Sequence, residues 1–101
     1  MRSTTMTKVS SDVFRDLGFS PAEARNLRLR SELMTALRKF IEQEGLTQAG
    51  AAKRLKVSQP RVSDLTCGKL SRFSLDSLVN MLTNAGMDVA VKIKRPIRRV
   101  A

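Results

Sequence analysis

The sequence contains no histidine, tryptophan or tyrosine and only one cysteine, Cys67. Without histidine, Ser-His and Cys-His nucleophile pairs are excluded, and the usual zinc sites built on histidine or on a cysteine cluster have no ligands. A single cysteine cannot form an internal disulfide, which agrees with a reducing compartment. We therefore expect no enzymatic activity, no metal site and no cofactor.

Long apolar runs are also missing. No stretch of about 18 apolar residues occurs, as a membrane-spanning helix would need. The N-terminal residues MRSTTMTKVSSDVF lack the apolar segment of a signal peptide. A chain of 101 residues suffices for one domain with a modest core. These features predict a soluble, cytoplasmic protein with no membrane partner.

Acidic residues are few compared with basic ones: nine Asp and Glu stand against 19 Lys and Arg, a formal charge of +10. Residues 1–46 carry eight basic and six acidic side chains (+2), whereas residues 47–101 carry eleven and three (+8). This excess of positive charge produces an electrostatic field that attracts polyanions regardless of their sequence. A nucleic acid would therefore meet the second half of the chain, which suggests association with the nucleoid.

A long helix is predicted to begin after Ser20. The stretch Ser20-Pro21-Ala22-Glu23 has a capping serine, a proline at the first helical position and a glutamate three residues after the serine. Apolar residues then follow three-and-four spacing as far as Gly45. The helix either runs continuously from Pro21 to Glu44 or breaks between Asn26 and Arg30.

Three shorter helices are predicted after Leu46. Thr47 can cap a helix of about two turns, and a turn at Lys56-Val57 leads into a second short helix from about Gln59 to Cys67. Ser74 caps a third helix, which runs to Ala85. The predicted inward-facing residues of the first two helices are Ala51, Ala52, Leu55, Val62 and Leu65.

Pro60 lies at the start of the second short helix. A proline in the first turn loses no intrahelical hydrogen bond, because the first N–H groups have no partner there. The residue before a proline avoids the helical region, so Gln59 can itself be the cap, with Ser58 as the alternative.

The last element has a period of two. In residues 87–94, large apolar residues alternate with small or polar ones, as in a half-buried β-strand. A lone strand leaves its backbone groups unpaired, so it needs a partner strand from elsewhere. We expect a homodimer in which this strand pairs with its own copy, through Met87, Val89, Val91 and Ile93.

Two short helices joined by a tight turn, with flanking helices and positive charge, form a helix-turn-helix. The pattern LTQ…A..L.VSQ..VS.L..GK of the lambda repressor/Cro-like, or XRE, domains is matched from Leu46 to Lys69, and the chain resembles this family. One position departs from it: Lys56 stands in the turn where the family often has glycine. A lysine there would adopt a left-handed conformation at a cost of about 1 kcal/mol.

More narrowly, the segments QPRVSDL, GK, FSLDSLVNML and AG, with the terminal strand and the VFRDLGF start, resemble the HigA-type antitoxin branch. The resemblance implies a mainly α, five-helix-type lambda repressor-like domain with one C-terminal β-strand. Residues 1–19 would be an N-terminal arm, 20–86 the DNA-binding domain, and 87–101 the strand and a basic tail. It also implies a repressor that autoregulates a toxin–antitoxin operon at a palindromic operator on double-stranded DNA, with a cognate toxin as partner.

The outer face of the second short helix would meet the DNA major groove. Gln59 can form hydrogen bonds with adenine, and Arg61 can form them with guanine. Asp64 can accept a hydrogen bond from cytosine, and Pro60 can pack on a thymine methyl group. Ser63 lies on the same face. Two alternatives remain open: Arg61 binds only phosphate, and Asp64 is a solvated or arginine-paired carboxylate.

Phosphate contacts are expected around these base contacts. The resemblance implies that Gln48, which opens the first motif helix, contacts phosphate and braces Gln59. The other expected phosphate neighbours are Thr47, Ser58, Lys69 and Arg72.

The segment VFRDLGF concentrates apolar side chains beside a polar N-terminus, namely Val13, Phe14, Leu17 and Phe19. They form either a flap over the domain's own core or a docking segment for a toxin. Two other functions stay open: a stand-alone XRE-type regulator without a toxin, and a protein-interaction module on the same fold. A nuclease would need a catalytic cluster that the sequence does not show.

Overall fold

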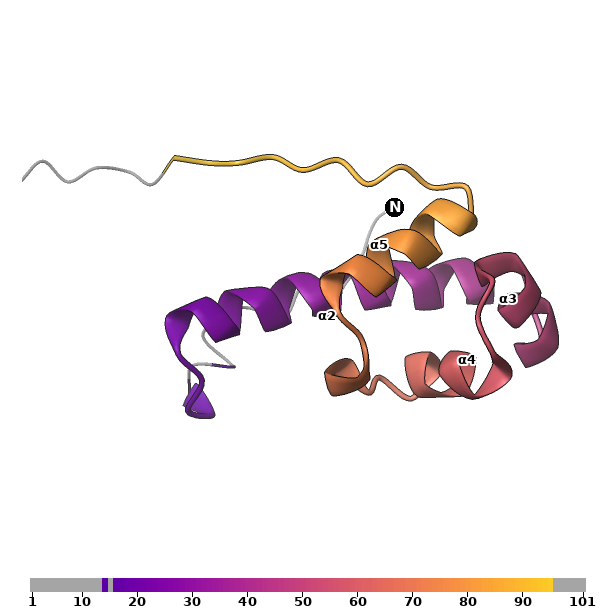
Figure 1. The fold of residues 1–101 in the computed structure, drawn as a ribbon, viewed down its shortest axis with the longest axis horizontal. Helices are drawn as coiled ribbons and strands as arrows, with labels where there is room; N and C mark the ends of the chain where they lie inside the picture. The colour runs from indigo at the N-terminus through magenta and orange to yellow at the C-terminus, as the bar shows by residue number, and fades with distance from the viewer. Residues whose placement is uncertain (1–13, 15, 96–101) are drawn as a thin grey trace, which may run out of the picture.

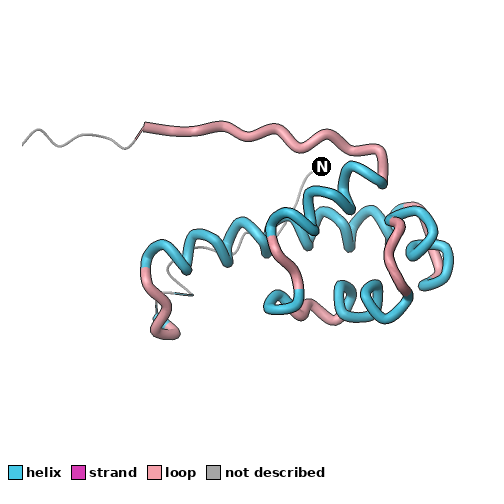
Figure 2. The backbone as a smooth tube through the Cα atoms, in the orientation of Figure 1, coloured by secondary structure: helices cyan, strands magenta, loops and turns pink. Residues whose placement is uncertain are grey.

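The computed structural model describes Phe14 and residues 16–95 (Figure 1). Val13 and residues 96–101 of the basic tail lie outside the described residues. The described part contains four α-helices and one short 3-10 helix, and no strand (Figure 2). These elements are α2 (Pro21–Gln43), α3 (Gln48–Leu55), α4 (Gln59–Thr66), η1 (Leu70–Arg72) and α5 (Leu75–Asn84). Phe14 and Asp16 are also helical.

Helix α2 begins with the predicted capping box. The Ser20 hydroxyl accepts from the Glu23 backbone N–H at 3.2 Å, and the Glu23 carboxylate accepts from the Ser20 backbone N–H at 3.0 Å. These hydrogen bonds from Ser20 lower the pKa of the Glu23 carboxyl, because they favour its charged form. The helix is continuous over its 23 residues, which decides between the two alternatives for its length.

The core lies over the C-terminal half of α2, where α4 and α5 contact α2, and α3 packs on α4 and α5 (Figure 1). Phe73, between η1 and α5, is the largest of its fully buried side chains. Burying a leucine or phenylalanine side chain stabilises a fold by roughly 1.5–3 kcal/mol, so these contacts fix the two motif helices in place. The buried core residues are Met34, Leu37, Leu55, Leu65, Phe73, Leu78, Met81, Leu82 and Ala85.

The buried face of α3 differs from the prediction by one residue. Ala51 and Leu55 are completely buried, whereas Ala52 is only half-buried. Residues four apart lie on the same face of a helix, so Ala51 shares the face of Leu55 and Ala52 is turned about 100° away. Of the two alanines, only Ala51 is fully buried on the inner face of α3.

The turn between α3 and α4 has the expected geometry. Lys56 is in the left-handed region, at φ 59° and ψ 45°, and it is the only non-glycine residue of the described chain with a positive φ. The Ala52 carbonyl accepts hydrogen bonds from the N–H groups of Lys56 and Val57. Val57 packs against the core, as predicted for the residue that fills the turn.

The predicted C-terminal strand is not formed within the single chain. After α5 the chain turns back, and residues 87–95 run above α5 and then past it without regular secondary structure (Figure 2). Met87 and Val89 pack against the core, whereas Val91 and Ile93 are 78% and 85% exposed. The reason is physical: no other described segment offers a strand edge with which to pair. The predicted five-helix-type arrangement is not shown either, because the elements of the described residues are four α-helices and η1.

Candidate nucleic-acid interface

Ser58 is the cap of α4. Its hydroxyl oxygen accepts from the backbone N–H of Arg61 at 3.3 Å, so Gln59 is the first helical residue and not the cap. Pro60 then lies in the first turn, where the absence of its N–H leaves no hydrogen bond unmade. The opening geometry thus agrees with the prediction, and it settles which of the two residues caps the helix.

Thr47 caps α3 in the same way, because its hydroxyl oxygen accepts from the Gly50 N–H at 3.0 Å. Both capping hydroxyls are on exposed residues, and each O–H remains able to donate to another acceptor. An exposed glutamine, Gln48 or Gln59, opens each helix. Helix N-termini carry partial positive charge, so these two ends have the donors and the sign of potential that a phosphate needs.

The inner and outer faces of α4 lie as the helical spacing predicts. Val62 and Leu65 are buried in the core side, while Gln59 and Pro60 are exposed. Ser63 is half-buried. The two exposed residues at the start of α4 are therefore free to meet a partner without any rearrangement of the fold.

Asp64 is a paired carboxylate. Its two oxygens lie 3.6 Å from the Lys69 ammonium and 3.4 Å from an Arg72 guanidinium nitrogen. The Asp64 side chain is only 17% exposed, while both basic partners lie on exposed residues. The arrangement matches the arginine-paired alternative for Asp64, and it directs the carboxylate toward the loop that follows α4.

Arg61 also contacts that loop. Its Nη1 donates to the Arg72 carbonyl at 2.7 Å, and its guanidinium lies 4.2 Å from the centre of the Phe73 ring. One connected cluster between α4 and η1 thus joins four residues that were expected as separate DNA contacts. They are Arg61, Asp64, Lys69 and Arg72.

Arg30 of α2 completes this cluster and was missed by sequence reasoning. Its Nη1 donates to the carbonyls of Leu70 and Phe73, at 3.2 and 3.1 Å, and its Nε donates to the Asn26 side chain at 2.7 Å. The sequence shows only one more basic residue on an amphipathic helix. Nothing local distinguishes it from its solvated neighbours.

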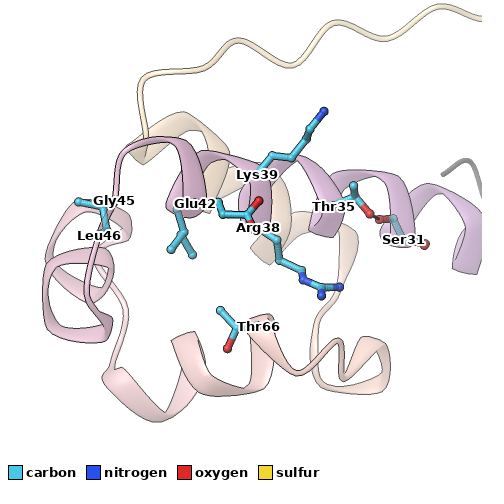
Figure 3. A pocket seen from close by; sticks show the side chains of 9 residues that line it. Ser31, Thr35, Arg38, Lys39, Glu42, Gly45, Leu46 and Thr66 are labelled. Carbon is cyan, nitrogen blue, oxygen red and sulfur yellow. Dashed lines mark hydrogen bonds between the residues drawn. The ribbon is translucent and has the colours of Figure 1, made fainter. Parts of the chain in front are cut away.

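A cleft of about 740 Å³ lies between α2 and the end of α4 (Figure 3). Arg38 extends from α2 into the space above α4, to one side of Thr66. None of the predicted DNA contacts lines this cleft. The cleft is lined by Ser31, Thr35, Arg38, Lys39, Ile41, Glu42, Gly45, Leu46 and Thr66.

The described residues include no cluster of side chains that could hold a metal ion. No described helix has the length and apolar character needed to cross a membrane.

Comparison with known proteins agrees with this geometry. A family model described as a helix-turn-helix domain matches residues 13–94. A solved structure named as an XRE family transcriptional regulator is 35% identical, with a TM-score of 0.71 over 78% of this chain and 89% of that one. The chain belongs to the XRE-type helix-turn-helix family. No curated protein matches it.

Within this helix-turn-helix family, the second helix of the motif enters the major groove and the first crosses the DNA backbone. The motif of this chain consists of α3 and α4, with Lys56 in the turn. Helix α4 therefore holds the position of the second helix of the motif. The family is not enzymatic, so the expectation that the chain is not an enzyme is confirmed.

Proposed function

We propose that this chain is a sequence-specific DNA-binding transcriptional repressor. The observation that carries the proposal is the start of α4, where Ser58 caps the helix and leaves Gln59 and Pro60 exposed on an XRE-type motif. The +8 charge of residues 47–101 supports it, because the motif lies in this basic half.

In this proposal Gln59 reads an adenine, Pro60 packs on a thymine methyl group and Ser63 lies at the edge of the contact. The helix N-termini bind the DNA backbone, because their exposed N–H groups and capping hydroxyls suit phosphate oxygens. The phosphate-binding residues are Thr47, Gln48, Ser58, Lys69 and Arg72, with Gln48 next to the backbone as the first residue of α3.

The repressor acts as a homodimer on a palindromic site. The exposed Val91 and Ile93 belong to a segment with strand alternation and no partner strand in the described chain. A two-fold axis lets this segment pair antiparallel with its own copy, through Met87, Val89, Val91 and Ile93. Such a dimer can place two recognition helices about 34 Å apart, one DNA turn, which a single short helix cannot achieve.

We further propose that the repressor is the antitoxin of a type II toxin–antitoxin operon, of the HigA type, and that its N-terminal segment binds the toxin. Phe14 and Phe19 contact each other edge to face, with ring centres 6.3 Å apart. Leu17 is 71% exposed and Phe19 41% exposed, and neither phenylalanine packs in the core cluster. Their arrangement supports a docking segment over a flap on the core.

An anisotropy titration tests the proposal. The purified chain is titrated onto a labelled duplex of the DNA upstream of its own reading frame, and onto a duplex of the same length with shuffled bases. The proposal predicts tight binding to the upstream duplex and weak, strongly salt-dependent binding to the shuffled one. Binding to neither duplex would favour a protein-interaction module.

A further inference from the structure

We infer that Arg61 is a positioning residue and not a base reader: it locks the loop of residues 69–73 against α4 so that Lys69 and Arg72 face the DNA backbone. The inference rests on the proposed DNA-binding function. It assigns to Arg61 a role that its place on the recognition helix does not suggest.

The loop is clamped by two arginines from different helices. Arg61 of α4 donates to the carbonyl of Arg72, and Arg30 of α2 donates to the carbonyls of Leu70 and Phe73. Three backbone carbonyls within four residues are thereby bound to guanidinium groups. A short 3-10 helix has poor internal hydrogen-bond geometry, so these external donors are what define the path of η1.

Arg61 is held by two contacts at once. Besides the 2.7 Å hydrogen bond, its guanidinium stacks on the ring of Phe73, which is 2% exposed and fixed in the core. A charged hydrogen bond and a cation–π contact are both among the stronger polar interactions on a protein surface. If the Arg61 side chain reached the edge of a guanine, it would lose both the hydrogen bond and the contact with the Phe73 ring. Gln59 and Pro60 can meet DNA without such a rearrangement.

The clamp also sets the electrostatics of the loop. Free carbonyl oxygens would repel a phosphate, but those of Leu70, Arg72 and Phe73 already accept from arginines. Asp64 holds the side chains of Lys69 and Arg72 from the α4 side without burying them. The loop therefore presents two aligned cations, ready for phosphate contact before DNA arrives.

The first arm of the test uses the free protein. Amide hydrogen exchange is measured for Arg72 and Phe73, whose N–H groups donate to the carbonyls of Lys69 and Leu70. Arg61→Ala should speed exchange at these two amides at least tenfold, while Gln59→Ala, on the same helix, should leave them unchanged. Unchanged exchange in Arg61→Ala would overturn the clamp.

The second arm measures binding to the upstream duplex and to the shuffled duplex. Arg61→Ala should weaken both by the same factor, roughly tenfold, as the loss of phosphate contacts does. Phe73→Leu should also weaken binding to both duplexes and lower the salt dependence of binding, although it removes no charge. If Arg61→Ala instead relaxes preference at one base pair and Phe73→Leu does not, Arg61 reads a base and the inference is wrong.

The two arms separate the inference from the proposed function. If the unmodified chain binds neither duplex, the repressor proposal fails, and the exchange measurement still decides whether Arg61 locks the loop. The exchange measurement also decides the matter if circular dichroism shows that Phe73→Leu does not fold.

Discussion

Arg30 and Phe73 lie 43 residues apart in the sequence, yet the Arg30 Nη1 donates a 3.1 Å hydrogen bond to the Phe73 carbonyl. The same nitrogen donates to the Leu70 carbonyl, so one side chain joins the long helix α2 to both ends of η1. The loop that follows the recognition helix is thereby tied to the framework of the domain.

Arg30→Ala should lower the free energy of unfolding by roughly 1–3 kcal/mol, because it leaves the partly buried Phe73 carbonyl without its arginine donor. The Leu70 carbonyl would keep only the hydrogen bond from the Phe73 N–H. Arg28→Ala is the matched control on the same helix. Within the described part of the chain, Arg28 pairs with Glu32 at (i, i+4), and we expect its loss to cost about 0.5 kcal/mol or less. Urea denaturation of both variants measures the difference, and equal losses would show that the Arg30 contacts do not stabilise the fold.

Local chemistry in the sequence predicts the helices of this fold and their ends. Ser20, Thr47 and Ser74 were expected as caps, and each side chain accepts a backbone N–H three residues on. The left-handed Lys56 and the inward-facing Val62 also follow from local rules, because turn geometry and helical period depend only on near neighbours.

The contacts of the long side chains could not be predicted in this way. Arg30 and Arg61 reach carbonyls 40 and 11 residues away, and Asp64 is paired by residues of the loop. Sequence spacing fixes which face of a helix a residue occupies but not which of several acceptors a flexible arginine finds.

Lys56→Gly should stabilise the fold by up to about 1 kcal/mol, because glycine adopts the left-handed turn without the strain that a Cβ brings. Lys53→Gly, an exposed site inside α3, should instead destabilise it by roughly 0.5–1 kcal/mol. Thermal unfolding followed by circular dichroism compares the two. A destabilised Lys56→Gly would mean that the lysine makes a compensating contact in the turn.

The double change of Phe14 and Phe19 to Ser should abolish co-purification of the toxin that we propose as the partner of this segment. The melting temperature should stay nearly constant, because neither ring packs in the core cluster. Phe73→Ser, in the core, provides the contrast and should lower the melting temperature strongly. A large drop in the Phe14 and Phe19 variant would support a flap over the core instead.

Val91→Pro should convert the proposed dimer to a monomer, because proline removes a backbone donor from the segment proposed to pair with its copy. Val91 is 78% exposed in the single chain, so the domain itself should fold normally. Sedimentation measures the state of association, and DNA affinity should fall with it. A variant that remains a dimer and binds DNA normally would show that the subunits join elsewhere.

The central claim is that α4 reads DNA sequence, and competition binding with Gln59→Ala tests it most directly. Unlabelled duplexes, each with one base pair changed, compete for the chain bound to its labelled upstream site. We predict that the unmodified chain discriminates at the base pair read by Gln59 by about 1–3 kcal/mol, and that Gln59→Ala loses discrimination at that position alone. An unchanged preference profile in Gln59→Ala would contradict the account.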